Sequence, residues 1–154
     1  MSARNVESLI GTLGLRVEGG FLTEIVFGGL LEEGSDDPLL DRTQRQLAEY
    51  FAGKRREFDL PLNPHGTPFQ RKVWDALRQI PYGETRSYGD IARAVGSPKG
   101  FRAVGMANHV NPIPVVIPCH RVVGSKGALT GYAGGLNIKS ALLELEKASL
   151  TKKT

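Results

Sequence analysis

The segment Ser87–His109, SYGDIARAVGSPKGFRAVGMANH, carries the pattern that decides the fold prediction. Ser87 is a typical helix N-cap, and Asp90 three residues later completes a weak capping box, so a short helix is predicted over YGDIARAV. Ser97 in the cap position and Pro98 as the first helical residue predict a second helix over PKGFRAVGMANH. Two short helices joined by a Gly-Ser turn are typical of a helix-turn-helix.

The second predicted helix has features of a helix that meets DNA. It carries two basic residues, Lys99 and Arg102. Small residues at four positions would let it lie close against a surface: Gly100, Ala103, Gly105 and Ala107. The plainer alternative is a pair of helices packed together for stability alone. Charge favours DNA, because residues 63–154 hold 13 Lys and Arg against 5 Asp and Glu, a net charge of +8.

Alternation of apolar and polar residues in the N-terminal part predicts a small antiparallel sheet. Its strands are predicted at residues 12–17, 21–27 and 57–62, and a Gly-Gly turn joins the first two into a hairpin. A helix is predicted between the second and third strands, with Asp37 as its N-cap and Pro38 as its first residue.

These patterns together predict an α+β protein with two domains. Residues 1–62 form a small mixed α/β domain, an antiparallel sheet plus a helix, with a net charge of −4. Residues 63–154 form a mostly helical domain with a winged-helix-like helix-turn-helix, and its last helix runs from about Ile138 to Ala148. The turn-rich sequence NPHG at residues 63–66 marks the boundary.

The protein has one cysteine, Cys119, which ends the aliphatic run IPVVIP, a predicted buried strand or extended segment. A lone cysteine is most often a small buried hydrophobe. Here His120 and Arg121 follow directly, and positive neighbours lower the pKa of a thiol and raise its reactive thiolate fraction. Adjacent residues of an extended segment point in opposite directions, so His120 is expected to act on Cys119 through a bridging water.

Composition excludes several classes of protein. With 40% apolar and 23% charged residues, the chain matches a soluble globular protein rather than a disordered one. It has no apolar run near the ~20 residues of a membrane span and no N-terminal signal region, so we expect a cytoplasmic protein without membrane contact. One cysteine excludes an internal disulfide, and without Cys-x-x-Cys no metal site is expected; no cofactor is expected either.

The sequence IPCHRVV, Ile117–Val123, resembles the active-site signature of the O6-alkylguanine-DNA alkyltransferases. The segment PYGETRSYGDIARAVGSPKGFRAVG, the Asn-Pro pair at 111–112 and the segment GYAGGLNIKSALLELE follow the family pattern in order and spacing, which covers Thr67–Lys147 closely. Residues 1–62 resemble the family's N-terminal domain only in layout. The resemblance implies a monomeric DNA-repair protein that moves the alkyl group of O6-alkylguanine in double-stranded DNA onto its own cysteine, once.

The resemblance also implies catalytic roles. Cys119 would accept the alkyl group, His120 would be the base acting through water, and Glu146 would orient and charge-balance that histidine. Tyr88 would press on the target phosphate and donate a proton to the departing guanine. Asn111 would be the hinge between the recognition helix and the active-site strand.

The DNA contacts follow from the same resemblance, which implies that the recognition helix enters the minor groove. Arg102 would fill the gap that the flipped nucleotide leaves in the base stack. Further DNA contacts are expected at Lys99, Ser97 and Ala103, and the base pocket would be lined by Pro114, Tyr132 and Ala133. Each residue also has a plainer interpretation, such as a solvated charge for Arg102 or Lys99 and a surface glutamate for Glu146.

This sequence departs from the family pattern at several positions. Residues 1–62 contain no cysteine, so the zinc site of some relatives is not expected here. Phe101 precedes Arg102 where small residues are frequent, and either core packing or DNA contact would explain it. Ala133 lacks the hydroxyl that some relatives place there, so recognition of the base would depend more on backbone N–H groups.

Two rival functions stay open from the sequence. One is a helix-turn-helix protein that senses alkylated DNA without transfer, although a pure binder needs no thiol. The other is a DNA-binding regulator with a redox-sensitive Cys119. The sequence leaves open the range of alkyl groups accepted and whether O4-alkylthymine is a substrate.

Overall fold

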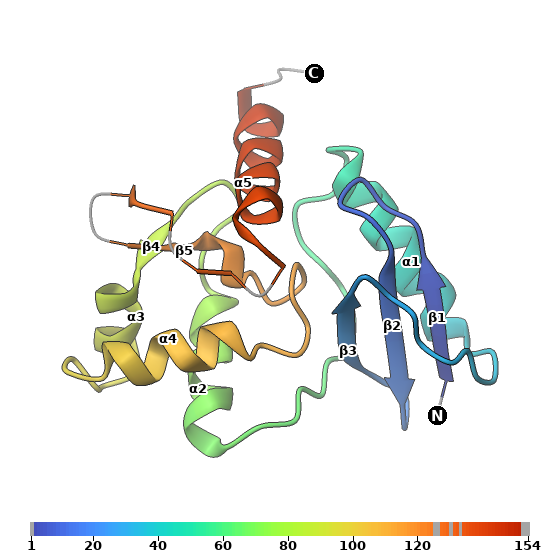
Figure 1. Cartoon of the computed structure of the whole chain (residues 1–154), viewed down its shortest axis with the longest axis horizontal. Coiled ribbons are helices and arrows are strands. Elements are labelled where there is room, and N and C mark those ends of the chain that lie inside the picture. Colours follow the sequence, from blue (N-terminus) through green and yellow to red (C-terminus); the bar gives the residue numbers. More distant parts are fainter. Residues whose placement is uncertain (1, 125–126, 130, 133, 152–154) are drawn as a thin grey trace. The chain divides into compact units, whose positions relative to one another are not determined.

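A computed structural model describes residues 2–124, 127–129, 131–132 and 134–151. The protein forms two compact units, Met1–His65 and Gly66–Thr154, each with its own buried apolar side chains. Figure 1 shows the helices and strands of both units in sequence order. Within the described ranges, no helix is both long and apolar enough to cross a bilayer.

Unit 1, Met1–His65, is built on a three-stranded antiparallel sheet in the order β1-β2-β3. The strands are β1 (Ser2–Val6), β2 (Leu13–Glu18) and β3 (Phe21–Phe27). The predicted hairpin between β2 and β3 is confirmed. Gly19 and Gly20 adopt φ values of 60° and 85°, which glycine tolerates at little cost in a tight turn.

The strand predicted at residues 57–62 is wrong, and β1 takes its place in the sheet. In the described part of the chain, their one strand-type pairing with the sheet is an isolated bridge from their last residue to β3. Two features keep their backbone out of a ladder. Pro61 has no N–H, and the side-chain amide of Gln46 binds both the N–H of Asp59 (2.9 Å) and its C=O (3.1 Å). The β1 sequence SARNV carries no clear alternation, so the pattern did not predict that strand.

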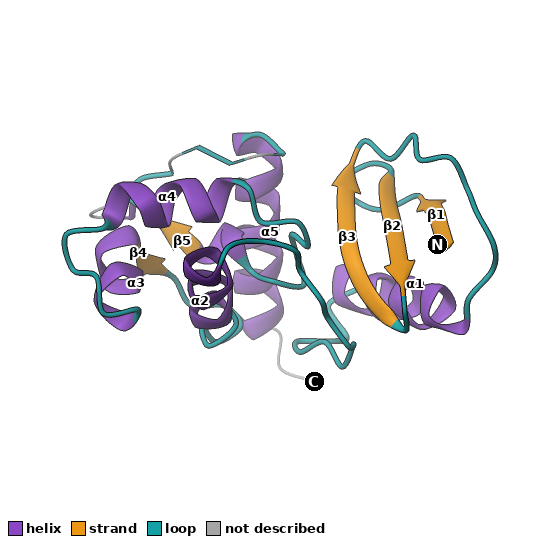
Figure 2. Ribbon diagram, turned by 90° about the horizontal axis from the view of Figure 1, so that it is seen from below, coloured by secondary structure: helices purple, strands orange, loops and turns teal. Residues whose placement is uncertain are grey.

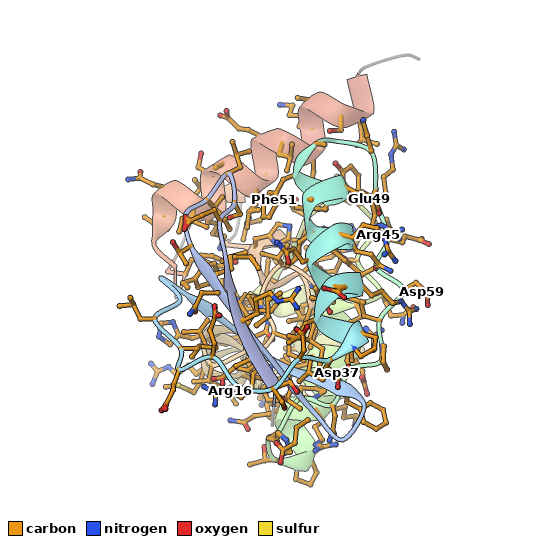
Figure 3. All side chains as sticks on the ribbon, turned by 90° about the vertical axis from the view of Figure 1, so that its right-hand side faces the viewer. Arg16, Asp37, Arg45, Glu49, Phe51 and Asp59 are labelled. Carbon is orange, nitrogen blue, oxygen red and sulfur yellow. The ribbon has the colours of Figure 1, made fainter. Side chains whose placement is uncertain are left out.

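Helix α1 (Pro38–Phe51) packs against this sheet, and Figure 3 shows Asp37 at its start and Phe51 near its end. The predicted N-cap is confirmed, because the carboxylate of Asp37 accepts the N–H of Leu39 at 2.8 Å. The helix and the strands share one core, which contains Leu13, Leu15, Val17, Leu22, Ile25, Leu40, Leu47 and Tyr50.

Unit 2, Gly66–Thr154, is mostly helical (Figure 2). Its helices are α2 (Pro68–Leu77), α3 (Tyr88–Ala94), α4 (Phe101–His109) and α5 (Leu136–Thr151). The predicted capping box of Ser87 and Asp90 at the start of α3 is confirmed. Helices α2, α3 and α4 pack against one another, and the indole N–H of Trp74 on α2 donates to the C=O of Ala107 on α4 at 2.8 Å.

The predicted start of α4 is wrong. Ser97 is not its cap and Pro98 is not its first residue, because α4 begins at Phe101 with Gly100 as N-cap. The Ser97 backbone is engaged elsewhere: its N–H donates to the C=O of Ala92 (2.8 Å), and its C=O accepts the N–H of Gly100 (2.7 Å). A turn therefore replaces the first helical residues.

The buried strand or extended segment predicted for IPVVIP is also wrong. Val115 adopts a φ of 73°, and the N–H of Ile117 donates back to the C=O of Ile113 at 2.9 Å, so the segment folds on itself. A 3₁₀ turn, η1 (Cys119–Arg121), follows and leads into β5 (Val122–Val123). Strand β5 pairs in parallel with β4 (Arg86–Ser87), a pairing that the sequence did not predict.

Candidate active site

Cys119 begins the turn η1 and is only 3% exposed. Burial raises the pKa of its thiol, whereas hydrogen bonds from the side chains of Asn111 and Tyr132 and the positive charge of Lys139 act to lower that pKa. The expectation that basic sequence neighbours lower the thiol pKa is therefore wrong for this structure. The Arg121 guanidinium is directed at Glu146, and the burial of the sulfur dominates. The sulfur nevertheless has polar and charged neighbours, as a thiolate would require.

His120 and Glu146 form a buried pair, 0% and 1% exposed. Nε2 of His120 lies 2.7 Å from Oε2 of Glu146. Burial lowers the pKa of His120 more than the carboxylate raises it, so the imidazole is neutral at neutral pH. A carboxylate can only accept, so Nε2 carries the proton and Nδ1 is the basic nitrogen. Nδ1 has no hydrogen-bond partner among the described residues.

Both carboxylate oxygens of Glu146 accept N–H donors. Oε1 accepts from Arg121 Nε (2.9 Å) and from the backbone N–H of Gly83 (3.1 Å). Oε2 accepts from His120 Nε2 (2.7 Å) and from Arg121 Nη2 (3.0 Å). Burial alone would raise the pKa of Glu146, but His120 and Arg121 outweigh it and hold that pKa well below its usual range. Glu146 is thus a stable carboxylate inside the protein.

Lys139 is a buried residue of this site that sequence reasoning missed. It precedes Leu142 by three residues and Glu146 by seven, so the three side chains lie on the same face of α5. All three are at most 1% exposed. Burial lowers the pKa of Lys139 and the charge of Cys119 raises it. The two groups therefore stabilise each other's charged forms. The helical spacing from Glu146 is the signal that would have revealed it.

Asn111 links the end of α4 to the active-site turn. Its Nδ2 donates to the C=O of Ile117 at 2.8 Å, and its Oδ1 accepts the N–H of Ile113 at 3.0 Å. Asn108, on the last turn of α4, reaches the C=O of Cys119 at 3.4 Å. Helix α4 and the cysteine turn are therefore connected by two side chains.

Two of the three predicted pocket residues lie in the described part of the protein. Pro114 is buried in the folded segment before Cys119. Tyr132 is 8% exposed and is one of the groups that act to lower the pKa of the Cys119 thiol. Ala133 lies outside the described residues.

Tyr88 reaches the neighbourhood of the site through the β4–β5 pairing. It follows β4 directly and opens α3, and β5 directly follows η1. The Tyr88 side chain is half-buried. The parallel pair thus carries the start of α3 to the segment that holds Cys119 and His120.

The predicted DNA-contact residues form a different group, on and before α4. Arg102, Ala103 and Lys99 are exposed and Ser97 is half-exposed, so they do not join the buried cluster around Cys119. Phe101 is 55% exposed beside Arg102, and core packing therefore does not explain it. In the described ranges, His, Cys, Asp and Glu side chains form no group of three or more that could hold a metal ion.

Comparison with known proteins decides the family. The profile of the 6-O-methylguanine DNA methyltransferase DNA binding domain matches residues 68–148, and that of the ribonuclease-like domain of 6-O-methylguanine DNA methyltransferase matches residues 6–64. The chain belongs to the 6-O-methylguanine DNA methyltransferase family. This confirms the resemblance found in the sequence, and also the α+β class, since solved members share the fold.

Individual relatives of this methyltransferase family match most of the sequence. The constitutive methylated-DNA–protein-cysteine methyltransferase of Bacillus subtilis is 57% identical over 122 residues, 79% of this protein and 74% of the relative. That of Mycobacterium tuberculosis is 50% identical over 151 residues, 94% of this protein and 92% of the relative. The structure of Mycobacterium tuberculosis OGT in complex with DNA has a TM-score of 0.88 at 49% identity, covering 97% of this protein and 94% of that one.

Proposed function

We propose that this protein repairs duplex DNA by moving an alkyl group from the O6 atom of guanine onto the sulfur of Cys119, once per molecule. Its relatives are named as methylated-DNA–protein-cysteine methyltransferases, and the protein is an enzyme of that class. The observation that carries the proposal is the buried Cys119 thiol beside the neutral His120, whose second nitrogen is bound to the Glu146 carboxylate.

The first chemical step is removal of the thiol proton. Nδ1 of His120 accepts the proton of Cys119 through a bridging water, while Nε2–H remains bound to Glu146. The resulting thiolate is stabilised by Asn111, Tyr132 and Lys139, the groups that act to lower the pKa of the thiol. The rise in pKa caused by burial keeps the sulfur protonated in the free protein and makes the base necessary.

The second step is displacement at the alkyl carbon. The thiolate sulfur forms a bond to that carbon, the carbon–O6 bond breaks, and its electron pair stays with the guanine. The hydroxyl of Tyr88 protonates the departing guanine and regains a proton from solvent, while His120 releases to solvent the proton that it took from Cys119. The product is a thioether on Cys119, and the sequence contains no second thiol to remove the alkyl group. Each protein molecule therefore transfers only one alkyl group.

DNA binding in this proposal uses the exposed side of α4. The O6 group of a stacked guanine is out of reach of a buried sulfur, so the nucleotide is flipped through the minor groove, which costs a few kcal/mol. Arg102 fills the vacated space, and Phe101 beside it offers an exposed aromatic surface to the neighbouring sugar or base. Lys99, Ser97 and Ala103 face the DNA backbone, where contacts carry no sequence information. Asn111 couples this helix to the cysteine turn.

The pocket residues Pro114, Tyr132 and Ala133 hold the flipped base in this proposal, and O4-alkylthymine is a second substrate to be tested in parallel. The sequence-based expectations of a monomer in the cytoplasm remain part of the proposal.

The test is transfer stoichiometry with duplex DNA that carries labelled O6-methylguanine. One methyl group per protein molecule, without turnover, is the expected result. Arg102→Ala is expected to weaken DNA binding and slow transfer while leaving the free energy of unfolding unchanged, because Arg102 is exposed. Binding of alkylated DNA without any transfer would instead support a damage sensor and contradict the proposal.

A further inference from the structure

Arg121 binds Glu146 as a two-pronged fork. Nε donates to Oε1 at 2.9 Å and Nη2 donates to Oε2 at 3.0 Å, so the guanidinium charge lies against both carboxylate oxygens. Oε2 is also the atom that accepts Nε2–H of His120 at 2.7 Å. One carboxylate oxygen thus receives the arginine and the histidine together.

The position of Arg121 is set by more than this carboxylate. Its Nη1 donates to the backbone carbonyl oxygen of Ile80 at 2.8 Å. Its Cζ lies 5.6 Å from the centroid of the Tyr82 ring, within range of a cation–π contact. The residue is 6% exposed. Because a backbone carbonyl and an aromatic ring also fix it, the guanidinium holds the orientation of Glu146.

The charge balance around His120 depends on this arginine. The charged groups that face the imidazole are Glu146 and Lys139 on α5, and Arg121 within η1. Glu146 favours the imidazolium, whereas Arg121, Lys139 and burial disfavour it. A carboxylate paired with His120 alone would draw a second proton onto the ring. An imidazolium has no lone pair and cannot act as a base.

We propose that Arg121 is a positioning residue for the transfer reaction proposed above. Its guanidinium neutralises Glu146, so that His120 stays an uncharged imidazole with its proton on Nε2 and its lone pair on Nδ1, ready for the proton of Cys119. Arg121 acts through Glu146 and His120. The role rests on the proposed function and assigns Arg121 a task that the sequence motif alone does not reveal.

The test is the pH profile of single-turnover methyl transfer at saturating O6-methylguanine duplex. Removing Arg121 takes away a positive charge that disfavours the imidazolium, so the pKa of His120 rises. At low pH the ring is then protonated and cannot act as a base, whereas at high pH it is neutral again. Transfer by Arg121→Met is expected to be about tenfold slower than transfer by wild type at about pH 6, and to come within about threefold of the wild-type rate at about pH 9. Arg121→Lys keeps the positive charge and is expected to return the profile toward that of wild type.

Arg55→Met is the matched control. Arg55 also binds a carboxylate, that of Glu49 at 2.8 Å, and a backbone carbonyl oxygen, that of Glu57 at 2.9 Å, but it lies in unit 1. It is expected to keep the wild-type profile. A loss of rate that is equal at every pH in Arg121→Met would indicate a purely structural role and overturn the proposal, as would an unchanged profile.

A measurement on the wild-type protein keeps the proposal testable if Arg121→Met does not fold. ¹⁵N NMR of the His120 ring is expected to show a neutral imidazole with its proton on Nε2 at about pH 7. An imidazolium at that pH would overturn the role of Arg121. If wild-type protein transfers no methyl group, the proposed function falls and this role with it. Transfer by wild type with an unaltered Arg121→Met profile overturns only the role of Arg121.

Discussion

Two of the clusters in which arginine binds carboxylates differ in their access to water. In unit 1, Arg4 binds Asp36 at 2.6 Å and Asp41 at 2.7 Å, and these carboxylate side chains are 86% and 68% exposed. In unit 2, Arg121 and Glu146 have side chains only 8% and 1% exposed. Exposed pairs contribute about 0.2–1 kcal/mol because water and salt screen them. A buried pair has no such screening, so the loss of one partner leaves the other uncompensated.

The same pair of groups therefore has different effects in the two clusters. The Arg4 cluster holds a surface loop near α1, where either charge is replaceable by water. The Arg121 cluster is buried, and its positive charge lowers the pKa of both Glu146 and His120, the residue beside Cys119.

The largest effect is expected from removing the buried carboxylate charge. Glu146→Gln leaves the Arg121 guanidinium without its counter-charge, so it is expected to lower the free energy of unfolding by about 3–5 kcal/mol. Asp41→Asn, the matched change in the exposed cluster, is expected to cost less than about 1 kcal/mol. Urea unfolding of both variants measures the difference. Equal costs would show that burial does not separate the two clusters.

A second prediction concerns the pH dependence of stability. Burial lowers the pKa of folded His120, so the unfolded protein takes up a proton that the folded one does not, and stability falls as the pH drops below about 6.5. The lowered pKa of Glu146 gives stability that is present above about pH 4.3 and lost as the pH falls below it.

Unfolding midpoints over this pH range check both windows. His120→Gln is expected to flatten the upper window and Glu146→Gln the lower one. A wild-type midpoint that rises as the pH falls from about 7 to about 5 would contradict the neutral state of the buried histidine.

The smallest effect is expected from the backbone donor to Glu146. Gly83 has a φ of 80°, and a Cβ built on it would lie 2.0 Å from Cδ1 of Leu150. Gly83→Ala is expected to cost about 1–2 kcal/mol because alanine disfavours the left-handed backbone conformation. The added Cβ also pushes the side chain of Leu150, on α5, out of its position. Gly96 has a similar φ, 76°, with open space around it, so Gly96→Ala measures the backbone penalty alone. In thermal unfolding, Gly83→Ala is expected to be less stable than Gly96→Ala. The reverse order would contradict the close contact between Gly83 and Leu150 of α5.

The fold was predictable wherever local signals agree with tertiary structure. Caps at Asp37 and Ser87 and the Gly-Gly hairpin are short-range devices, and the structure has all of them. The errors arose where long-range contacts override local pattern. Ser97 looks like a cap, but its backbone is tied to α3 and to Gly100. Residues 57–62 alternate like a strand, but the side-chain amide of Gln46 hydrogen-bonds to the backbone N–H and C=O of Asp59.

The candidate site was predictable in part, for a related reason. Cys119, His120 and Glu146 lie in motifs that resemble a family pattern, and the structure brings them together. Arg121 and Lys139 read as ordinary basic residues because their burial is decided by the packing of α5 on η1. The thiol pKa was misjudged for the same reason, since sequence neighbours say nothing about desolvation.

In the proposed reaction the sulfur of Cys119, and no other atom of the protein, receives the alkyl group. The most direct measurement is peptide mass mapping after reaction with duplex DNA containing O6-methylguanine. One added methyl group is expected, confined to the peptide that holds Cys119. None is expected in Cys119→Ser, which should still bind the DNA. A methyl group on any other residue, or continued transfer by Cys119→Ser, would contradict the proposed reaction.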